Sequence, residues 1–389
     1  MYFFHRIRKF LYYVVPALVF LSCGKENKIQ LEELSQFSID LPYRPLIYKS
    51  GIINCTPDSS LLYFYNPATY SRIDFFSAHQ HLVKTVSLKK VKRKCLAINN
   101  IAVVSPDSIF ILSDHTNQIF LIDGNGNVLN QRIFLDSSVA HFKLELTSSL
   151  LSGFLFNDDQ LVFKCSYYPA ERNNRFRNYY SYNRQSCYFA SISIYDVFNP
   201  ACKLKFHLKG FYNYFLANGD CNVEPPYYVF EKNNILMGST YSDTVYILDR
   251  DFTLKHKIKL QSQYTPAIKC RPMRYNISGE DYLIGEDSLG LRQTMSAMIS
   301  NITFDEFRKL YYFTIIHPVD PDFEEERKFI ERRSSVLIYD TNFSFLQEVL
   351  IPKALTHEVF IRKDGLMWKL NDKDEIDHYK YALYNIKTK

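Results

Sequence analysis

The stretch that decides the fold is residues 107–127, which reads DSIFILSD, then HTNQ, then IFLID, then GNGN. Two runs of β-branched and aromatic residues are separated by a short polar turn, which is the pattern of two antiparallel strands. The second run ends on Asp123, directly before a turn rich in glycine and asparagine. This unit matters because it recurs along the chain.

The same strand ending appears as ISIYD up to Asp196, VYILD up to Asp249 and VLIYD up to Asp340, with weaker copies at Ser77 and Asn385. The six strand-ending residues are separated by 46, 73, 53, 91 and 45 residues. Intervals of about 45 to 50 residues suit four-stranded propeller blades, and the two long intervals predict blades with insertions. We therefore predict an all-β, six-bladed β-propeller. A seven-bladed ring and a pair of β-sandwiches are the alternatives.

Two local features extend this prediction. An Asp or Asn at the end of the third strand can accept hydrogen bonds from the backbone of the next turn. The last blade runs out of chain soon after Asn385, whereas the segment from Ile29 to Leu41 has no blade of its own. We expect this N-terminal strand to close the ring, which removes an exposed sheet edge. A hairpin is predicted around Lys363-Asp364-Gly365, with the glycine at a positive φ.

The N-terminus has the three parts of a secretory signal. Residues 1–9 carry Arg6, Arg8 and Lys9 and no acid, and an apolar run from Phe10 to Leu21 follows. Ser22 then precedes Cys23. A cysteine in this position resembles the lipobox of bacterial lipoproteins, in which the cysteine thiol is acylated, although Phe20 stands where Leu, Val or Ile is usual.

The expected organisation is a lipoprotein signal peptide over residues 1–22, a lipidated N-terminus and short linker over 23–28, and the propeller over 29–389. The apolar run is too short for a spanning helix, which needs about 20 residues. The remaining alternative is an ordinary cleavage site that an incidental Cys23 follows. We expect a cell-envelope protein, attached to the outer membrane through a lipid on Cys23.

Charge and cysteine content exclude several classes of protein. The whole chain has 47 Lys and Arg against 41 Asp and Glu, and removal of residues 1–22 takes away three of the bases. This balance does not favour nucleic-acid binding, and the basic run from Lys89 to Lys94 is interpreted as a solvated strand edge. The cysteines have no zinc-ligand spacing, so no metal and no cofactor is expected. Cys165–Cys187 and Cys202–Cys221 are possible bridges, with buried free thiols as the alternative.

A lipobox, a short linker and a six-bladed ring with a Phe- and Tyr-rich repeat resemble the Bacteroidota lipoproteins of the domain of unknown function family 4221. The chain is also similar to the broader TolB-like and NHL-like six-bladed propellers. The resemblance covers nearly the whole chain after the signal peptide. It implies a location in the cell envelope and a propeller fold, and it implies no catalytic residues.

Strand order predicts where a site would lie. Connections between second and third strands leave from the same face as the connections between blades, and the chain places its insertions there. Long loops on a rigid scaffold commonly carry function. The candidate binding residues of the third-blade and fifth-blade insertions are Tyr168, Arg172, Arg175, Arg177, Tyr179, Tyr180, His317, Asp320 and Asp322.

The basic and aromatic third-blade insertion suits a protein or glycan partner, because Tyr and Arg commonly anchor interfaces. The acidic fifth-blade insertion could instead form salt bridges with it. No catalytic motif is present, and the lone Trp368 is interpreted as core or channel lining. The sequence therefore favours a binding protein of unknown specific role, with a hydrolase or lyase acting on a polymer as the alternative. An enzyme would need titratable groups that converge within hydrogen-bond reach.

Overall fold

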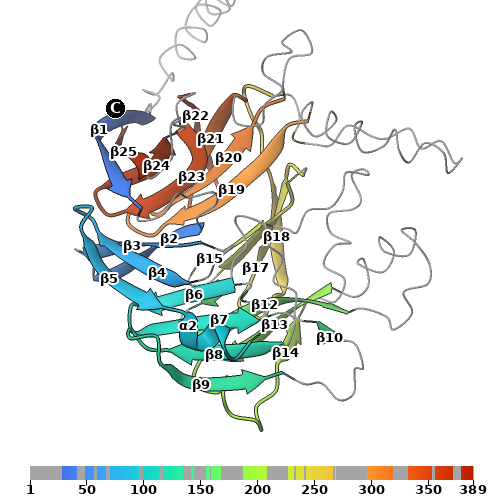
Figure 1. The fold of residues 1–389 in the computed structure, drawn as a ribbon. Coiled ribbons are helices and arrows are strands. Elements are labelled where there is room, and N and C mark those ends of the chain that lie inside the picture. The colour runs from blue at the N-terminus through green and yellow to red at the C-terminus, as the bar shows by residue number, and fades with distance from the viewer. Residues whose placement is uncertain are drawn as a thin grey trace, which may run out of the picture.

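In the computed structural model, the chain forms six antiparallel sheets arranged as the blades of a ring (Figure 1). The structure describes residues 29–41, 49–56, 59–66, 71–95, 98, 100–113, 117–134, 142–143, 155–157, 159–167, 187–207, 227–231, 234–240, 242–265, 268, 296–318, 332–352, 355–370 and 378–388. No helix within these ranges is long and apolar enough to cross a membrane.

Each blade follows the chain from an inner strand to an outer strand. Blade one comprises β2 (Lys49–Thr56), β3 (Ser59–Tyr65), β4 (Arg72–Ser77) and β5 (Leu82–Ser87). Blade two comprises β6 (Asn100–Ser105), β7 (Ser108–Ser113), β8 (Gln118–Ile122) and β9 (Val128–Ile133). Blade three comprises β10 (Phe142–Lys143), β11 (Leu155–Asn157), β12 (Gln160–Tyr167), β13 (Cys187–Ser193) and β14 (Lys205–His207). Blade four comprises β15 (Tyr227–Glu231), β16 (Asn234–Gly238), β17 (Thr244–Leu248) and β18 (Leu254–Lys259). Blade five comprises β19 (Met298–Asp305), β20 (Leu310–Ile316), β21 (Ser334–Asp340) and β22 (Phe345–Ile351). Blade six comprises β23 (Leu355–Arg362), β24 (Gly365–Leu370), β25 (His378–Thr388) and β1 (Ile29–Asp40).

The N-terminal strand closes the ring, as predicted. β1 pairs antiparallel with β25 from Ile29 opposite Thr388 to Asp40 opposite His378, and so supplies the outer strand of the last blade. The inner strands β2, β6, β11, β15, β19 and β23 contact one another in succession, and β23 contacts β2 again. The six-bladed prediction is therefore confirmed, against a seven-bladed ring or two sandwiches.

The predicted turn capping is confirmed in blades two, four and five. The Oδ1 atom of Asp340 accepts hydrogen bonds from the backbone N–H groups of Asn342 (2.9 Å) and Ser344 (2.8 Å). Asp123 and Asp249 each accept two backbone N–H groups at the same offsets. These carboxylates hold the third strand to the outer strand, so the recurring acid of the sequence has a physical role in every one of these three blades.

The fourth residue of each capped turn contacts the preceding blade. Phe252 adopts a φ of 63° and Phe343 a φ of 62°, both in the left-handed region. Phe252 stacks on His207 of blade three, with 4.4 Å between ring centroids, and Phe343 contacts His256 of blade four. At the equivalent Gly126 an added Cβ would lie 2.1 Å from the Ser87 oxygen of blade one, so only glycine fits. The turns thus join neighbouring blades as well as neighbouring strands.

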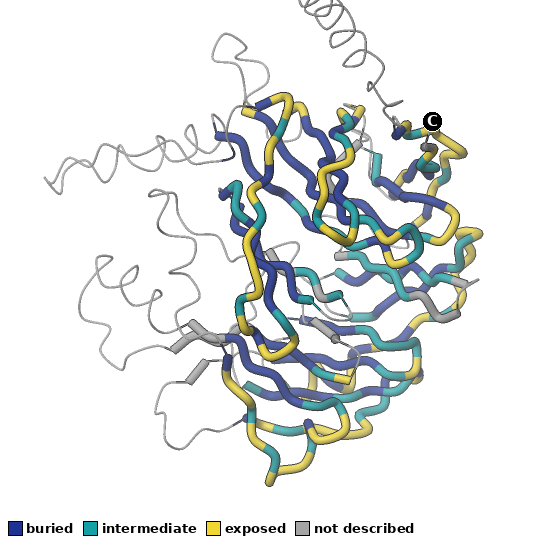
Figure 2. Tube along the Cα trace, turned by 180° about the vertical axis from the view of Figure 1, so that it is seen from behind, coloured by how far each residue is buried: buried dark blue, intermediate teal, exposed yellow. Residues whose placement is uncertain are grey.

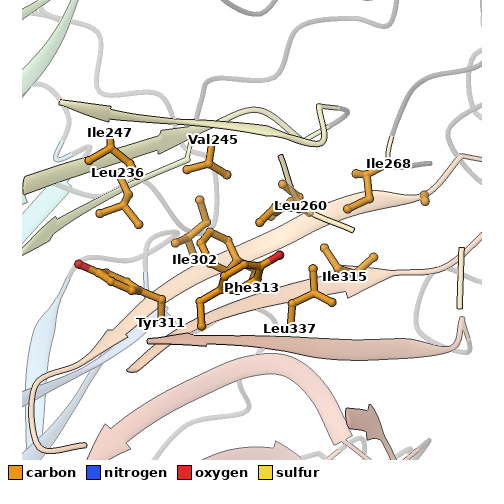
Figure 3. Close-up of a cluster of buried hydrophobic side chains, with 13 residues drawn as sticks. Leu236, Val245, Ile247, Leu260, Ile268, Ile302, Tyr311, Phe313, Ile315 and Leu337 are labelled. Carbon is orange, nitrogen blue, oxygen red and sulfur yellow. The ribbon is translucent and has the colours of Figure 1, made fainter. Parts of the chain in front are cut away.

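Burial follows the position of a strand within its blade (Figure 2). The middle strands β7 and β8 are almost wholly buried, whereas the outer strands β9 and β18 are mostly exposed. The cores lie between adjacent blades, since each middle strand packs on both faces. Between blades four and five, Leu236 packs with Ile302 and Phe313 (Figure 3). Trp368 is 1% exposed, which confirms that it belongs to the core.

Three local predictions were wrong. Lys89–Lys92 forms the short helix α2, with Val91 buried, and not a strand edge. Gly365 is not at a positive φ, because it pairs with Arg362 inside the ladder. It is a glycine because an added Cβ would lie 2.4 Å from the Tyr384 oxygen. Asn385 ends no strand, since β25 continues to Thr388 beside β1.

Blade three departs from the regular pattern. Its inner strand is split into β10 and β11, which both pair with β12. Its third strand β13 ends at Ser193, so Asp196 lies in the following turn and its N–H bonds the Ser193 carbonyl (3.1 Å). Cys95 and Cys202 are free thiols, so the pairing of Cys202 with Cys221 is not formed. The side chains of the other candidate pair lie outside the described residues.

Candidate functional site

The antiparallel order of the strands defines one face of the ring that we call the loop face. Connections between second and third strands and connections between blades leave from it. Its long segments are the third-blade insertion between β12 and β13, the fifth-blade insertion between β20 and β21, and the connections from β14 to β15 and from β18 to β19. The predicted positions of the third-blade and fifth-blade insertions in the blades are confirmed.

Of the predicted binding residues, only His317 lies within the described part of the chain. Tyr168, Arg172, Arg175, Arg177, Tyr179, Tyr180, Asp320 and Asp322 lie outside it, as does Cys23. His317 directly follows β20 and is 5% exposed, so it lies beneath the loop face and not on its surface.

His317 belongs to a buried chain of hydrogen bonds across blade five. Its Nε2 atom lies 2.9 Å from the hydroxyl oxygen of Ser335 on β21. That hydroxyl donates to the Oε1 atom of Glu348 on β22, at 2.5 Å. Glu348 is 3% exposed and Ser335 is fully buried. We call these three residues, together with Arg332, the base cluster.

The hydrogen-bond network assigns the protons of this cluster. Ser335 has one hydroxyl hydrogen, and the short contact to Glu348 uses it. Nε2 of His317 therefore carries a hydrogen and donates to Ser335, while Nδ1 is left without a hydrogen-bond partner among the described residues. Burial lowers the pKa of His317, and Arg332 and Arg333 lower it further, whereas Glu348 opposes them. The imidazole is neutral in this arrangement.

Glu348 also holds the start of the connection between blades four and five. Its Oε1 atom accepts a hydrogen bond from the Ser262 hydroxyl (2.7 Å), and its Oε2 atom accepts one from the backbone N–H of Gln263 (2.5 Å). The ring of Tyr264 meets His317 edge to face, with 5.9 Å between centroids. Both carboxylate oxygens are satisfied, which a buried charge requires.

Arg332 holds the end of the same connection and both ends of the fifth-blade insertion. It is 4% exposed, and its Nη2 atom donates to the carbonyl of Ser296 (2.5 Å). Its Nε atom donates to the carbonyl of His317 (2.8 Å), and the N–H of His317 donates to the carbonyl of Arg333 (2.8 Å). The base cluster therefore fixes four chain ends: two of the connection and two of the insertion.

The base cluster is not arranged for nucleophilic catalysis. In a Ser–His–acid triad the histidine lies between the serine and the acid. Here the serine lies in the middle, its hydrogen is engaged by Glu348, and no solvent reaches its oxygen. Within the described ranges no group of three or more His, Cys, Asp or Glu residues could hold a metal ion.

A second histidine–serine pair supports a structural role for this geometry. In blade three, the Nε2 atom of His207 on the outer strand β14 lies 2.8 Å from the Ser191 hydroxyl oxygen on the third strand β13, whereas His317 and Ser335 join the end of the second strand to the third. His207 stacks on Phe252 of blade four, and burial followed by Lys205 lowers its pKa. A polar pair in this position thus joins outer strands and neighbouring blades.

Sequence reasoning missed Ser335, Glu348 and Arg332. The heptapeptide of β22, FLQEVLI, gives no sign that its glutamate is buried while Phe345 and Leu346 are exposed. The two arginines before β21 were the only available signal, since a basic pair at the entry to a buried strand needs partners.

The fold and these contacts define the class of protein as a six-bladed β-propeller. A crystal structure of a member of the domain of unknown function family 4221 from Bacteroides vulgatus is similar over 94% of this chain and 100% of that one, with a TM-score of 0.67 and 14% identity. At this identity the likeness shows the fold alone, and the resemblance expected from the sequence is confirmed at that level.

A Bacteroides fragilis protein that is predicted to be exported is similar over 94% of this chain and 98% of that one, with a TM-score of 0.49 and 11% identity. A luciferin-regenerating enzyme is similar over 91% and 98%, with a TM-score of 0.45 and 10% identity. No protein-family model matches the sequence, and no curated protein matches it either.

Proposed function

We propose that this protein is a lipid-anchored, exported propeller of the outer membrane whose loop face binds a protein or a glycan. The observation that carries the proposal is the base cluster, which fixes two long segments of the loop face to one buried network. A scaffold that holds long loops at their ends presents them in a defined place, as binding surfaces require.

The composition of the loop-face segments supports a macromolecular partner. The third-blade insertion combines several tyrosines with Arg172, Arg175 and Arg177. Such residues provide large contact areas and hydrogen bonds to carboxylates or sugar hydroxyls. The alternative of a hydrolase or lyase gains no support from the base cluster, because its serine is buried and donates its hydrogen to Glu348 and not to His317.

Attachment and location are tested on intact cells. We expect metabolic labelling with a fatty-acid analogue to mark the wild type and not Cys23→Ala, and the variant to leave the membrane fraction. Outer-membrane fractionation of the wild type, with proteinase shaving, then distinguishes an outward-facing from an inward-facing protein. An unlabelled wild type, or a variant that stays bound to the membrane, would contradict lipid anchoring.

Binding is tested by placing a photo-crosslinking residue at Tyr179 in the native membrane and by probing a glycan array with the purified protein. We expect a discrete adduct or a defined glycan signal that the triple variant Arg172→Ala, Arg175→Ala, Arg177→Ala loses at least ten-fold. The control removes the same charge from α2, with Lys89→Ala, Lys90→Ala and Lys92→Ala, and should retain the signal. Equal loss in both variants, or none in the first, would refute a specific loop-face site.

A further inference from the structure

We infer that the edge of the ring where blades five and six meet, at Phe345 and Leu346, contacts the lipid bilayer, and that the loop face points away from it. The inference rests on the proposed lipid anchor at Cys23. It adds which surface the membrane covers and therefore which surface a partner can reach.

The first residue of β1 fixes where the lipid anchor reaches the ring. Ile29 is 4% exposed, pairs with Thr388 and donates its backbone N–H to the side-chain oxygen of Gln347 on β22, at 2.5 Å. Cys23 precedes Ile29 by six residues, which span at most about 21 Å when fully extended. The lipid must therefore lie within that reach of Gln347.

Apolar side chains lie exposed at this point. Phe345 and Leu346, which directly precede Gln347, are 41% and 44% exposed. Outer strands elsewhere also expose apolar residues, such as Leu129 on β9 at 58%. Phe345 and Leu346 lie directly beside the residue that Ile29 contacts, whereas Leu34 of β1 and Leu350 of β22, which are also exposed, lie further along their strands. A tethered protein gains by burying such groups in the interfacial region of a bilayer, because their transfer out of water is favourable.

The loop face lies at the other end of the same blade. Arg333 precedes β21 and is exposed, whereas Leu346 lies near the opposite end of the β21–β22 hairpin, about 20 Å away at 3.3 Å per residue. Ile29 pairs with Thr388 at the end of β25, the third strand of blade six, whereas the insertions of the loop face lead into the beginnings of third strands. The tether and the insertions thus leave from opposite sides of the ring.

The test places a photo-crosslinking residue in the full-length protein at Leu346, Arg333 or Leu129 and measures adducts with labelled phospholipid in native membranes. Arg333 is the control within the same blade. Leu129 is the matched control for strand position, since each leucine is the second residue of an outer strand. We expect several-fold more lipid adduct at Leu346 than at either control, and Phe345 serves as a second probe of the same edge.

Fatty-acid labelling of Cys23, measured in parallel, separates the two ideas. A labelled protein with equal adducts at all three positions, with most adduct at Arg333, or with none at Leu346 and Phe345 would overturn the orientation and leave the lipid anchor standing. A protein with no label on Cys23 would overturn both the anchor and the orientation.

Discussion

A single carboxylate at the end of the third strand stabilises the turn that follows it and positions a residue of that turn against the preceding blade. Asp340 accepts two backbone N–H groups of the following turn, and this turn places Phe343 against Tyr311, with 4.9 Å between ring centroids, and against His256 of blade four. The capping acid therefore acts on strand pairing and on blade packing at once. It is the one residue of the repeat whose role follows from the sequence pattern.

We expect Asp340→Ala to lower the free energy of unfolding by about 1 kcal/mol, the usual cost of losing a side-chain acceptor at a turn or helix end. Asp340→Asn should cost less, because its amide oxygen can still accept both N–H groups. Urea denaturation followed by circular dichroism measures the difference. Equal effects of the two variants would show that the negative charge and not the hydrogen bonds matters.

The buried histidine predicts a stability that depends on pH. Burial lowers the pKa of His317 in the folded chain, with Glu348, Arg332 and Arg333 as the charged groups that face it. Below a pH of about 6.5 the unfolded chain binds a proton that the folded chain does not, so stability is lost as the pH falls. The loss is at most about 1.4 kcal/mol per pH unit for one histidine.

We therefore expect the wild type to lose unfolding free energy between pH 7.5 and pH 5.5, and His317→Gln to lose less over the same range. Urea titrations at several pH values give both curves. His207, whose pKa burial also lowers, contributes to both proteins alike. Parallel curves for the two proteins would rule out His317 as a source of the dependence.

At the scale of the elements, ring closure depends on the strand that is furthest in sequence from its partner. β1 contributes Ile39, which is fully buried among side chains that include Phe64 of blade one and Tyr381 of blade six. The same strand exposes Leu34 by 48% at a bulge. One strand thus provides a core position and a surface position for comparison.

We expect Ile39→Ala to lower the free energy of unfolding by about 2 to 4 kcal/mol, since it leaves a cavity where blades six and one meet. Leu34→Ala should change it by less than about 0.5 kcal/mol. Both are measured by urea denaturation. Similar small values for the two variants would mean that β1 adds little to the closed ring.

At the scale of the whole molecule, arginines join separate parts of the ring through backbone carbonyls. Arg132 of blade two donates to the carbonyls of Val197 (2.9 Å) and Cys202 (2.6 Å) in blade three. Arg332 does the same for Ser296 and His317, at the ends of two loop-face segments. Both arginines donate to backbone carbonyls, but Arg132 joins two blades whereas Arg332 fixes the ends of two loop-face segments.

We expect Arg332→Met to increase the rate of proteolytic cleavage between residues 261 and 297 and between 317 and 333, because the ends of both segments lose their donor. Arg132→Met is the matched control and should leave cleavage in these segments unchanged. Limited proteolysis with mass spectrometry measures both. Faster cleavage in both variants would indicate a general loss of stability and not release of the loop face.

The amino-acid sequence determined the blade number, the capping acids of blades two, four and five, and ring closure by residues 29–41. These features follow from local chemistry that recurs with a period: alternating apolar runs, a capping acid and a turn. The repeat can be recognised in the sequence because every blade buries its middle strands between two neighbouring blades in the same way. The positions of the insertions followed from that period as well.

Only the tertiary structure decided the base cluster, the burial of His317 and the edge of the ring from which β1 enters. Ser262, His317, Ser335 and Glu348 are distant in sequence and meet because blades four and five pack together. The ends of β1 are placed by its pairing with β25, more than 300 residues away. No periodic pattern encodes such contacts, because they depend on how whole blades face one another.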